Sequence, residues 1–260
     1  MAPILVTGAT GSLGRAVVRQ LLATGSDVRA LSRRAQSASE SVEWVTADLS
    51  EPDGLEEAVR GTTAIIHCAS NPLSKSDDIE ATLNLIEAAR RAGTPHLVYI
   101  SIVGVDRVPL GYYRTKRTVE RIIENADIPS TILRATQFHD LILMMARNLV
   151  RLPVMAVPAE TDFQPVDVED VAERLVRFAL GAPAGRAPDL GGPQVRAMTD
   201  LARLYLRASG KQRRVVPIRV PGKVFRGYRE GGHLAPDHAD GEVTFERFLA
   251  ERFGRSREDG

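Results

Sequence analysis

Residues capable of proton-transfer chemistry lie close together in the middle of the sequence. Ser101 is followed by Tyr112 and Lys116, and the last two are four residues apart, so on a helix their side chains share one face. A phenol ionises near pH ~10 and exchanges protons poorly at neutral pH unless a cation stabilises its phenolate. The spacing predicts that Lys116 lowers the pKa of Tyr112, that Tyr112 transfers a proton, and that Ser101 hydrogen-bonds a substrate oxygen. The adjacent Tyr113 is an alternative phenol for substrate contact, although it lacks this spacing.

A glycine-rich turn near the amino terminus is a second chemical feature. Gly8, Gly11 and Gly14 follow a short apolar run and lead directly into a helical pattern. The amino end of a helix offers unpaired N–H groups and a partial positive charge, which attract a pyrophosphate where small residues allow close approach. This arrangement is typical of dinucleotide binding. We expect the cofactor to contact Gly8, Thr10, Gly11, Ser12, Leu13 and Gly14.

The residues about twenty positions further on predict which dinucleotide binds. A site for NAD usually has an acidic residue there, which binds the ribose 2′-hydroxyl. This chain instead has Ser32, Arg33 and Arg34. Guanidinium groups pair with a 2′-phosphate through charge-assisted hydrogen bonds, so we predict NADP(H) as the cofactor. Further cofactor contacts are expected where the next strands end, at Asp48, Leu49, Ala69 and Ser70, although Asp48 is equally suited to capping a helix.

The order of apolar patterns predicts the elements that position these residues. Short β-branched runs alternate with helical patterns, which is typical of βαβ units and a parallel sheet. Strands are expected at 4–7, 28–31, 43–46, 64–68, 97–101 and 131–133. Helices are expected at 13–23, 54–59, 78–91 and 116–125. The predicted fold is α/β, a Rossmann-type doubly wound parallel sheet.

The pattern changes after about residue 150, where prolines divide shorter elements. We predict an NAD(P)-binding core over residues 1–150 and a smaller carboxyl-terminal region over 151–260 that caps the substrate. A helix is expected over 168–180, and another over 201–206 with Thr199 as its N-cap. Residues 187–190 are expected to return as a further strand.

Composition limits the classes of partner. The chain of 260 residues is 43% hydrophobic and 26% charged and has a net charge of +1, which argues against nucleic acid as a partner. Residues 211–229 are basic and are interpreted as a solvated face or as a surface that meets an anionic substrate. The single cysteine, Cys68, and the absence of a membrane-spanning apolar run predict a cytoplasmic protein without a membrane partner. We expect a monomer or homodimer that binds a small-molecule substrate and no metal.

The motifs resemble those of atypical short-chain dehydrogenase/reductases of the NmrA-like, isoflavone-reductase-like group. The resemblance rests on the segment 7–14, on Ser101 with Tyr112 and Lys116, and on the segment 164–172. It implies that Lys116 also binds the nicotinamide ribose and that residues 135–139 lie beside the nicotinamide and the substrate. Thr136 and Phe138 are thereby implied to contact the cofactor, and Gln137 the substrate. The tyrosine of this group is often absent, so its presence here favours catalysis.

His139 is a further candidate for substrate contact or proton relay, because the loop after the sixth strand opens at the ligand-binding edge of such a sheet. The alternative is a histidine at a helix start without a chemical role. Three functions remain open. The first is an NADPH-dependent reductase of a carbonyl or conjugated double bond in a small, aromatic or polyketide-like molecule. The others are an NADP(H)-sensing regulator without turnover and an epimerase or dehydratase.

Overall fold

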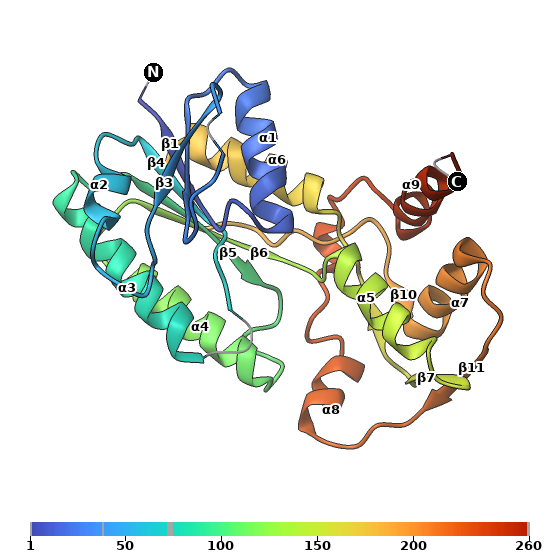
Figure 1. The fold of residues 1–260 in the computed structure, drawn as a ribbon. Coiled ribbons are helices and arrows are strands. Elements are labelled where there is room, and N and C mark those ends of the chain that lie inside the picture. The colour runs from blue at the N-terminus through green and yellow to red at the C-terminus, as the bar shows by residue number, and fades with distance from the viewer. Residues whose placement is uncertain (1, 38, 72–74, 259–260) are drawn as a thin grey trace. The chain divides into compact units, whose positions relative to one another are not determined.

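The computed structural model describes residues 2–37, 39–71 and 75–258 and divides into two compact units (Figure 1). The first unit contains residues 1–101, 111–134 and 171–188, and the second contains 102–110, 135–170 and 189–260. The pattern of prolines predicted one boundary, after residue 150. The chain instead returns to the first unit after entering the second, because a late helix and strand complete the first sheet. The substrate-capping role of residues 151–260 stays a prediction.

The first unit is built on a seven-stranded sheet in the order β3-β2-β1-β4-β5-β6-β9. Its strands are β1 (Ile4–Thr7), β2 (Val28–Ser32), β3 (Val42–Thr46), β4 (Ala64–His67), β5 (His96–Ile102), β6 (Ser130–Ala135) and β9 (Gly185–Arg186). All residues of β1 and β4 are buried, as expected for parallel strands covered on both faces. The strand order reverses between β1 and β4, which is the crevice where doubly wound sheets bind ligands. The predicted Rossmann-type fold is confirmed.

Helices cover both faces of this sheet (Figure 1). On one face lie α2 (Leu55–Val59), α3 (Lys75–Arg91) and α4 (Gly111–Glu124), and on the other lie α1 (Ser12–Ala23) and α6 (Val168–Leu180). The apolar stripes of α2, α3 and α4 pack against alternate strand residues such as Leu5, Ile65 and Leu97, which are all fully buried. Apolar residues that recur every two positions in the strands and about every 3.6 positions in the helices therefore pack together in one core.

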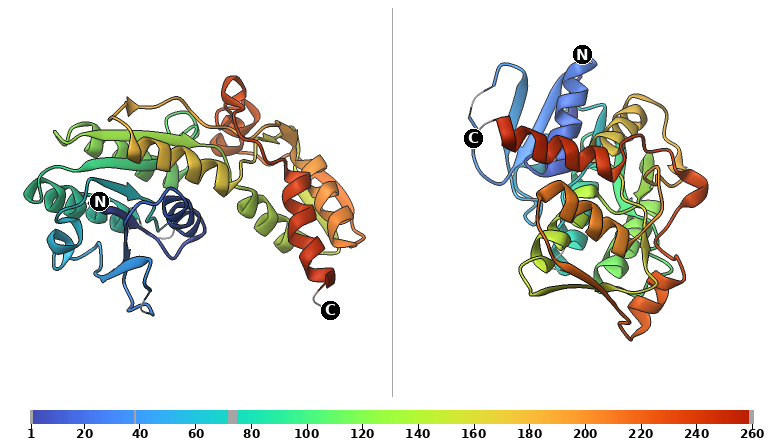
Figure 2. Two further views of the ribbon diagram at one scale, coloured as in Figure 1. Left: turned by 90° about the horizontal axis from the view of Figure 1, so that it is seen from above. Right: turned by 90° about the vertical axis from the view of Figure 1, so that its right-hand side faces the viewer.

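The second unit has a smaller core between helices and short strands. Its helices are α5 (His139–Leu149), α7 (Met198–Ser209), α8 (Lys223–Arg229), the short helix η1 (Pro236–His238) and α9 (Phe245–Glu258). Its strands form two pairs, β7 (Val154–Pro158) with β11 (Arg214–Ile218) and β8 (Asp162–Phe163) with β10 (Arg196–Ala197). Buried side chains of α5, β7, α7 and α9 form one cluster. Figure 2 shows α7 and α9 side by side.

Three local expectations need adjustment. Helix α4 begins at Gly111 rather than at residue 116, so the Tyr112-x-x-x-Lys116 motif lies within one continuous helix. The expected N-cap Thr199 is wrong, because α7 begins at Met198 after the N-cap Ala197. The Met198 N–H already donates to the Thr161 carbonyl, so no side-chain cap is needed at that position. The returning strand is Gly185–Arg186, two residues earlier than expected.

Candidate active site

The glycine turn has the geometry that a phosphate cradle requires. Gly8 has φ +66°, a left-handed conformation that favours glycine, and a Cβ on it would lie 2.6 Å from the backbone nitrogen of Ala69. A Cβ on Gly14 would collide with the carbonyl of Gly8, so helix and turn can pack only without a side chain there. Gly11 is the N-cap of α1 and provides no side-chain cap, which leaves the amino end of the helix open for an anion.

A cavity of about 420 Å³ in the first unit runs along the ends of β1, β2, β3 and β4. Its lining includes most of the residues predicted to hold the cofactor, namely Gly8, Thr10, Gly11, Ser32, Arg33, Asp48, Leu49, Ala69 and Ser70. Ser12, Leu13, Gly14, Arg34 and Lys116 are outside this lining. Sequence reasoning missed Ser50, Asn71, Asp77, Asp78 and Ala81, which line the same cavity. Asp77 and Asp78 could have been recognised in the sequence as residues at the start of a helix, because acidic residues are favoured in the first helical turn.

The loop after β2 places Arg33 at the rim of this cavity. Arg33 and Arg34 are both exposed, whereas Ser32 is buried. The Ser32 hydroxyl donates to the Arg34 carbonyl at 2.8 Å and accepts from the Arg34 N–H at 3.2 Å, so it holds the tight turn that presents the two arginines. Of the two guanidinium groups, that of Arg33 lines the cavity and is better placed for a 2′-phosphate.

Asp48 does not cap the helix that follows, whose N-cap is Gly54, and its predicted contact with the cofactor stays a prediction. Its Oδ1 atom accepts hydrogen bonds from the N–H and the hydroxyl of Ser50, at 3.0 and 2.9 Å. The backbone hydrogen bond from Ser50 is the largest influence on the carboxyl and lowers the pKa of Asp48. Asp48 therefore shapes its own turn while it lines the cavity.

The predicted catalytic pair lies at the start of α4. Lys116 is only 3% exposed, and its Nζ lies 4.8 Å from the centre of the Tyr99 ring and 5.8 Å from that of the Tyr112 ring. Burial lowers the pKa of Lys116 to about 8. Burial raises the pKa of Tyr112 to about 12, so the expected lowering by Lys116 is wrong for this structure. The hydroxyl of Tyr112 instead hydrogen-bonds Ser70 Oγ at 2.6 Å.

Ser101 is 2% exposed and lies beside a network of buried charges. Its hydroxyl has no hydrogen-bond partner among the described residues, although it is near enough to Glu120 to help keep the pKa of that carboxyl low. Glu120 is fully buried and accepts two hydrogen bonds from Arg134, at 2.6 and 2.7 Å. Ser101 therefore lies on β5, beside Glu120 of α4, rather than on the helix that carries the candidate pair. Tyr113 is 5% exposed and belongs to the buried part of α4.

The remaining predicted site residues lie in the second unit, where their polar atoms contact that unit itself. Thr136 Oγ1 donates to the Gln164 carbonyl, and Gln137 Nε2 donates to the His233 carbonyl at 3.1 Å. His139 is 1% exposed, its Nε2 contacts the Val243 carbonyl at 2.9 Å, and its ring lies near those of Phe245 and Phe248. These contacts favour a structural role for His139.

Phe138 is half-buried and forms an isolated bridge with Val166 immediately before α5. It is the one residue of the segment 136–139 that is not fully buried, since Thr136, Gln137 and His139 are each at most 6% exposed. Within this segment, the side chain of Phe138 is therefore the most accessible to a ligand.

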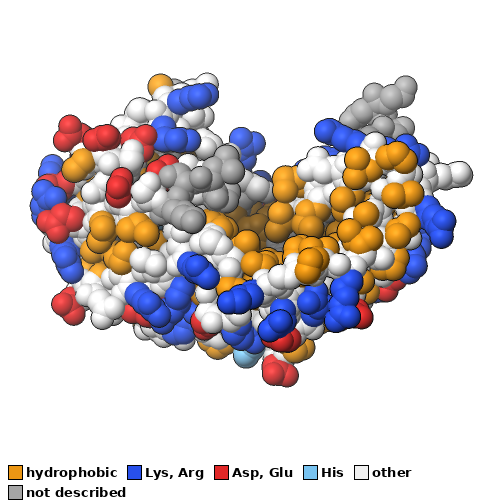
Figure 3. Space-filling model, turned by 90° about the horizontal axis from the view of Figure 1, so that it is seen from below, with side chains coloured by type: hydrophobic (Ala, Val, Ile, Leu, Met, Phe, Trp, Pro, Cys, Tyr) orange, Lys and Arg blue, Asp and Glu red, His pale blue; other side chains and the backbone are white. Residues whose placement is uncertain are grey.

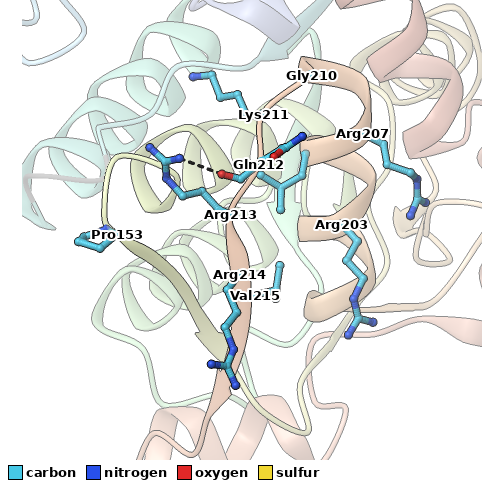
Figure 4. A pocket seen from close by; sticks show the side chains of 10 residues that line it. Pro153, Arg203, Arg207, Gly210, Lys211, Gln212, Arg213, Arg214 and Val215 are labelled. Atoms are coloured by element: carbon cyan, nitrogen blue, oxygen red, sulfur yellow. Dashed lines mark hydrogen bonds between the residues drawn. The ribbon is translucent and has the colours of Figure 1, made fainter.

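A larger hollow of about 860 Å³ lies in the second unit, between α7 and β11 (Figure 4). Its basic side chains are those of Arg203, Arg207, Lys211, Arg213 and Arg214. Figure 4 shows their charged ends pointing in different directions rather than towards one point. A small anion needs convergent donors, so this hollow fits the solvated basic face considered for residues 211–229.

The face of the molecule drawn in Figure 3 carries both signs of charge, in agreement with a net charge of +1. Figure 3 shows basic and acidic side chains intermixed, with hydrophobic side chains grouped between them.

No helix among residues 2–37, 39–71 and 75–258 is long and apolar enough to cross a membrane. Within the same ranges, no three or more His, Cys, Asp or Glu side chains are arranged to hold a metal ion.

The glycine turn and the cavity beside it define a protein of the dinucleotide-binding class. A family model of NAD(P)H-binding proteins matches residues 8–179. The chain belongs to this NAD(P)H-binding family, in agreement with the resemblance that its motifs indicated, and its cofactor is NAD(P)H.

Known relatives include proteins of different roles. Photosystem II assembly factor Ycf39 of Trieres chinensis is 28% identical over 260 residues, covering 92% of this chain and 81% of that protein. The (4-alkanoyl-5-oxo-2,5-dihydrofuran-3-yl)methyl phosphate reductase of Streptomyces griseus is 29% identical over 224 residues, covering 84% and 77%. The NADPH complex of the Escherichia coli quinone oxidoreductase QOR2 superposes with a TM-score of 0.83 at 22% identity, covering 96% and 99%, and shows the same fold.

Proposed function

We propose that the protein is an NADPH-dependent oxidoreductase that reduces a carbonyl or conjugated double bond of a small, apolar, aromatic or polyketide-like molecule. The observation that carries this proposal is the contact between Ser70, in the lining of the cofactor cavity, and Tyr112, on the face of α4 that also bears Lys116. A dinucleotide-binding protein without chemistry needs the cavity but has no need of a phenol and a buried cation beside it.

The residues of the first unit suit both parts of such a reaction. NADPH would supply the hydride. The glycine turn would hold the pyrophosphate and Arg33 the 2′-phosphate. Tyr112 would deliver the proton, and its raised pKa keeps it protonated at neutral pH, as a proton donor must be. Lys116 would place a positive charge beside the oxygen on which negative charge develops.

The exposed face of α5, in the second unit, would suit an apolar ligand. Leu141 and Met144 are 42% and 52% exposed, whereas Ile142, Leu143 and Ala146 of the same helix are buried in the core of the second unit. Large exposed apolar side chains on one helix face are typical of a surface that binds an apolar partner. Methionine adapts readily to ligands of different shapes.

A second candidate is an NADP(H)-binding protein that acts through a partner without turnover. It is favoured by the similarity to the assembly factor Ycf39 over 92% of this chain. The raised pKa of Tyr112 is also compatible with a phenol that takes part in no reaction.

One experiment separates the two candidates. The full chain is mixed with NADPH and a panel of quinones, enones and ketones, and the loss of NADPH absorbance is followed. The oxidoreductase is expected to consume NADPH in proportion to an acceptor, and Tyr112→Phe is expected to slow this consumption. Tight NADPH binding without consumption across the panel would favour the partner-dependent candidate.

A further inference from the structure

A residue outside the predicted catalytic set, Ser70, connects Tyr112 to the buried carboxylate of Asp78. Ser70 Oγ donates to Asp78 Oδ2 at 2.6 Å, and the same oxygen lies 2.6 Å from the Tyr112 hydroxyl. The other carboxylate oxygen of Asp78 accepts the Asn71 N–H at 2.6 Å. Asp78 is 7% exposed and belongs to the first turn of α3, where the helix dipole favours negative charge.

The direction of these hydrogen bonds follows from counting protons. A serine hydroxyl has one hydrogen, and an ionised carboxylate can only accept. Ser70 therefore gives its hydrogen to Asp78, so Ser70 Oγ accepts the hydrogen of Tyr112. A bond of this length to a serine held by a carboxylate is short and strong. The phenolic O–H of Tyr112 is thus held in one orientation.

We propose that Ser70 and Asp78 are positioning residues for Tyr112: the charge of Asp78 keeps the phenol protonated, and Ser70 orients its hydroxyl and stabilises the phenolate that remains after proton transfer. The inference rests on the proposed function. When the Tyr112 O–H bond breaks, its proton forms a new O–H bond on the substrate oxyanion. The Ser70 hydrogen then turns from Asp78 to the phenolate and hydrogen-bonds it, and a proton taken up from solvent restores the Tyr112 phenol. Ser70 is exposed, so solvent reaches it.

Among the described residues, few other groups near the phenol could accept its hydrogen. Lys116, on the same helix, lies 5.8 Å from the centre of the Tyr112 ring, and it can stabilise a phenolate but does not accept its hydrogen. Tyr99 of β5 is a neighbouring phenol whose pKa burial raises far above its usual value. Asp78 acts on Tyr112 through its charge and through Ser70. Among these groups Ser70 alone has a hydroxyl within hydrogen-bond distance of Tyr112 Oη.

The test measures the ionisation of the phenol directly, without a substrate. A fluorinated tyrosine, whose phenol ionises at lower pH, is placed at position 112 of the full chain and titrated by fluorine NMR with NADP⁺ bound. Ser70→Ala removes a hydrogen bond that favours the phenolate and is expected to raise the pKa at position 112. Asp78→Asn removes a nearby negative charge and is expected to lower it. Opposite shifts from two residues in one chain distinguish the proposed network from a general loss of structure.

Asp77→Asn is the matched control. Asp77 is also in the first turn of α3 and accepts from the Asn71 side chain at 3.0 Å, whereas the single hydroxyl hydrogen of Ser70 goes to Asp78. We expect it to shift the pKa at position 112 less than Asp78→Asn does. Equal shifts from the two asparagine variants, or no shift from Ser70→Ala, would overturn the inference. The substrate panel decides the proposed function separately, since the titration requires no turnover.

Discussion

Two buried charged residues, Lys116 and Glu120, lie one turn apart on α4 and differ in whether they are paired with an opposite charge. Glu120 is fully buried and is contacted by three arginines, with Arg134 at 2.6 Å, Arg117 at 3.0 Å and Arg186 at 3.7 Å. Lys116 is 3% exposed and contacts the Ile100 carbonyl at 3.4 Å, with no carboxylate within ion-pair distance among the described residues. A buried charge with partners stabilises the fold only if its pairing is complete, whereas an unpaired one marks a site where charge is used.

The pKa values of the two groups express the same difference. Burial acts to raise the pKa of Glu120, but the hydrogen bonds from Arg134 and Ser101 and the charges of Arg134 and Arg186 together outweigh it, so the pKa is lowered. Burial lowers the pKa of Lys116 to about 8, and the nearby negative charges, of which Asp78 is the largest, offset it only in part. One end of the helix is therefore anchored to β6 and β9, and the other carries the unpaired charge that the proposed reaction would use.

The largest effect is expected at the unpaired end. Tyr112→Phe should reduce turnover by roughly 10²–10⁴-fold, the contribution of general acid catalysis, while it leaves NADPH affinity nearly unchanged. Lys116→Ala should reduce both, because the resemblance implies that Lys116 also holds the nicotinamide ribose. Steady-state kinetics with an acceptor from the panel, together with calorimetry of NADPH binding, measure the two quantities. Full activity of Tyr112→Phe would remove the phenol from the reaction.

At the paired end the effect should be on folding. Glu120→Ala leaves the buried guanidinium of Arg134 without its partner and should lower the free energy of unfolding by about 3–5 kcal/mol. Lys116→Met removes a buried charge that has no partner and should leave stability unchanged or increase it. Urea denaturation of both variants measures the contrast. Similar losses from the two variants would show that Lys116 also stabilises the fold.

The difference in stability between the wild-type chain and Lys116→Met should also depend on pH. The pKa of Lys116 is about 8 in the folded chain and near its ordinary 10.5 when unfolded. Between these values the unfolded state binds more protons, so stability rises with pH, and the penalty for the buried cation is present below pH 8. Relative to Lys116→Met, the wild-type chain should gain about 3 kcal/mol from pH 8 to 10.5. Denaturation of both chains at several pH values measures it, and parallel curves would contradict it.

The smallest effect is expected at an exposed charge. Arg33 lies at the rim of the cofactor cavity, where solvent weakens its interactions. Arg33→Asp should nevertheless narrow or reverse the preference for NADPH over NADH, by roughly 10–100-fold, the worth of hydrogen bonds to a charged group. Arg34→Ala, outside the cavity lining, is the matched control and should change the preference less. Equal dissociation constants for NADPH and NADH in the wild-type chain would contradict the predicted cofactor choice.

Local pattern was sufficient for the main elements and for part of the site. The predicted strands and helices of the first unit all occur, with bounds that differ by a few residues. That residues of the turn and of the strand ends would line one cavity was predictable, because a parallel sheet brings the carboxyl ends of its strands to one edge. Gly8 and Gly14 were recognisable because only glycine allows so close an approach of backbone to backbone.

The sequence by itself determined the dinucleotide-binding fold, the glycine turn and the shared helix face of Tyr112 and Lys116, since each depends on residues near one another in the chain. Only the tertiary structure decided how polar side chains are used. It brought Ser70 to Tyr112 across 42 positions and directed His139 to the Val243 carbonyl across 104. Contacts of this range depend on the packing of whole elements. A side chain's type and spacing therefore state which chemistry it can perform, and its distant neighbours decide whether it is free to do so.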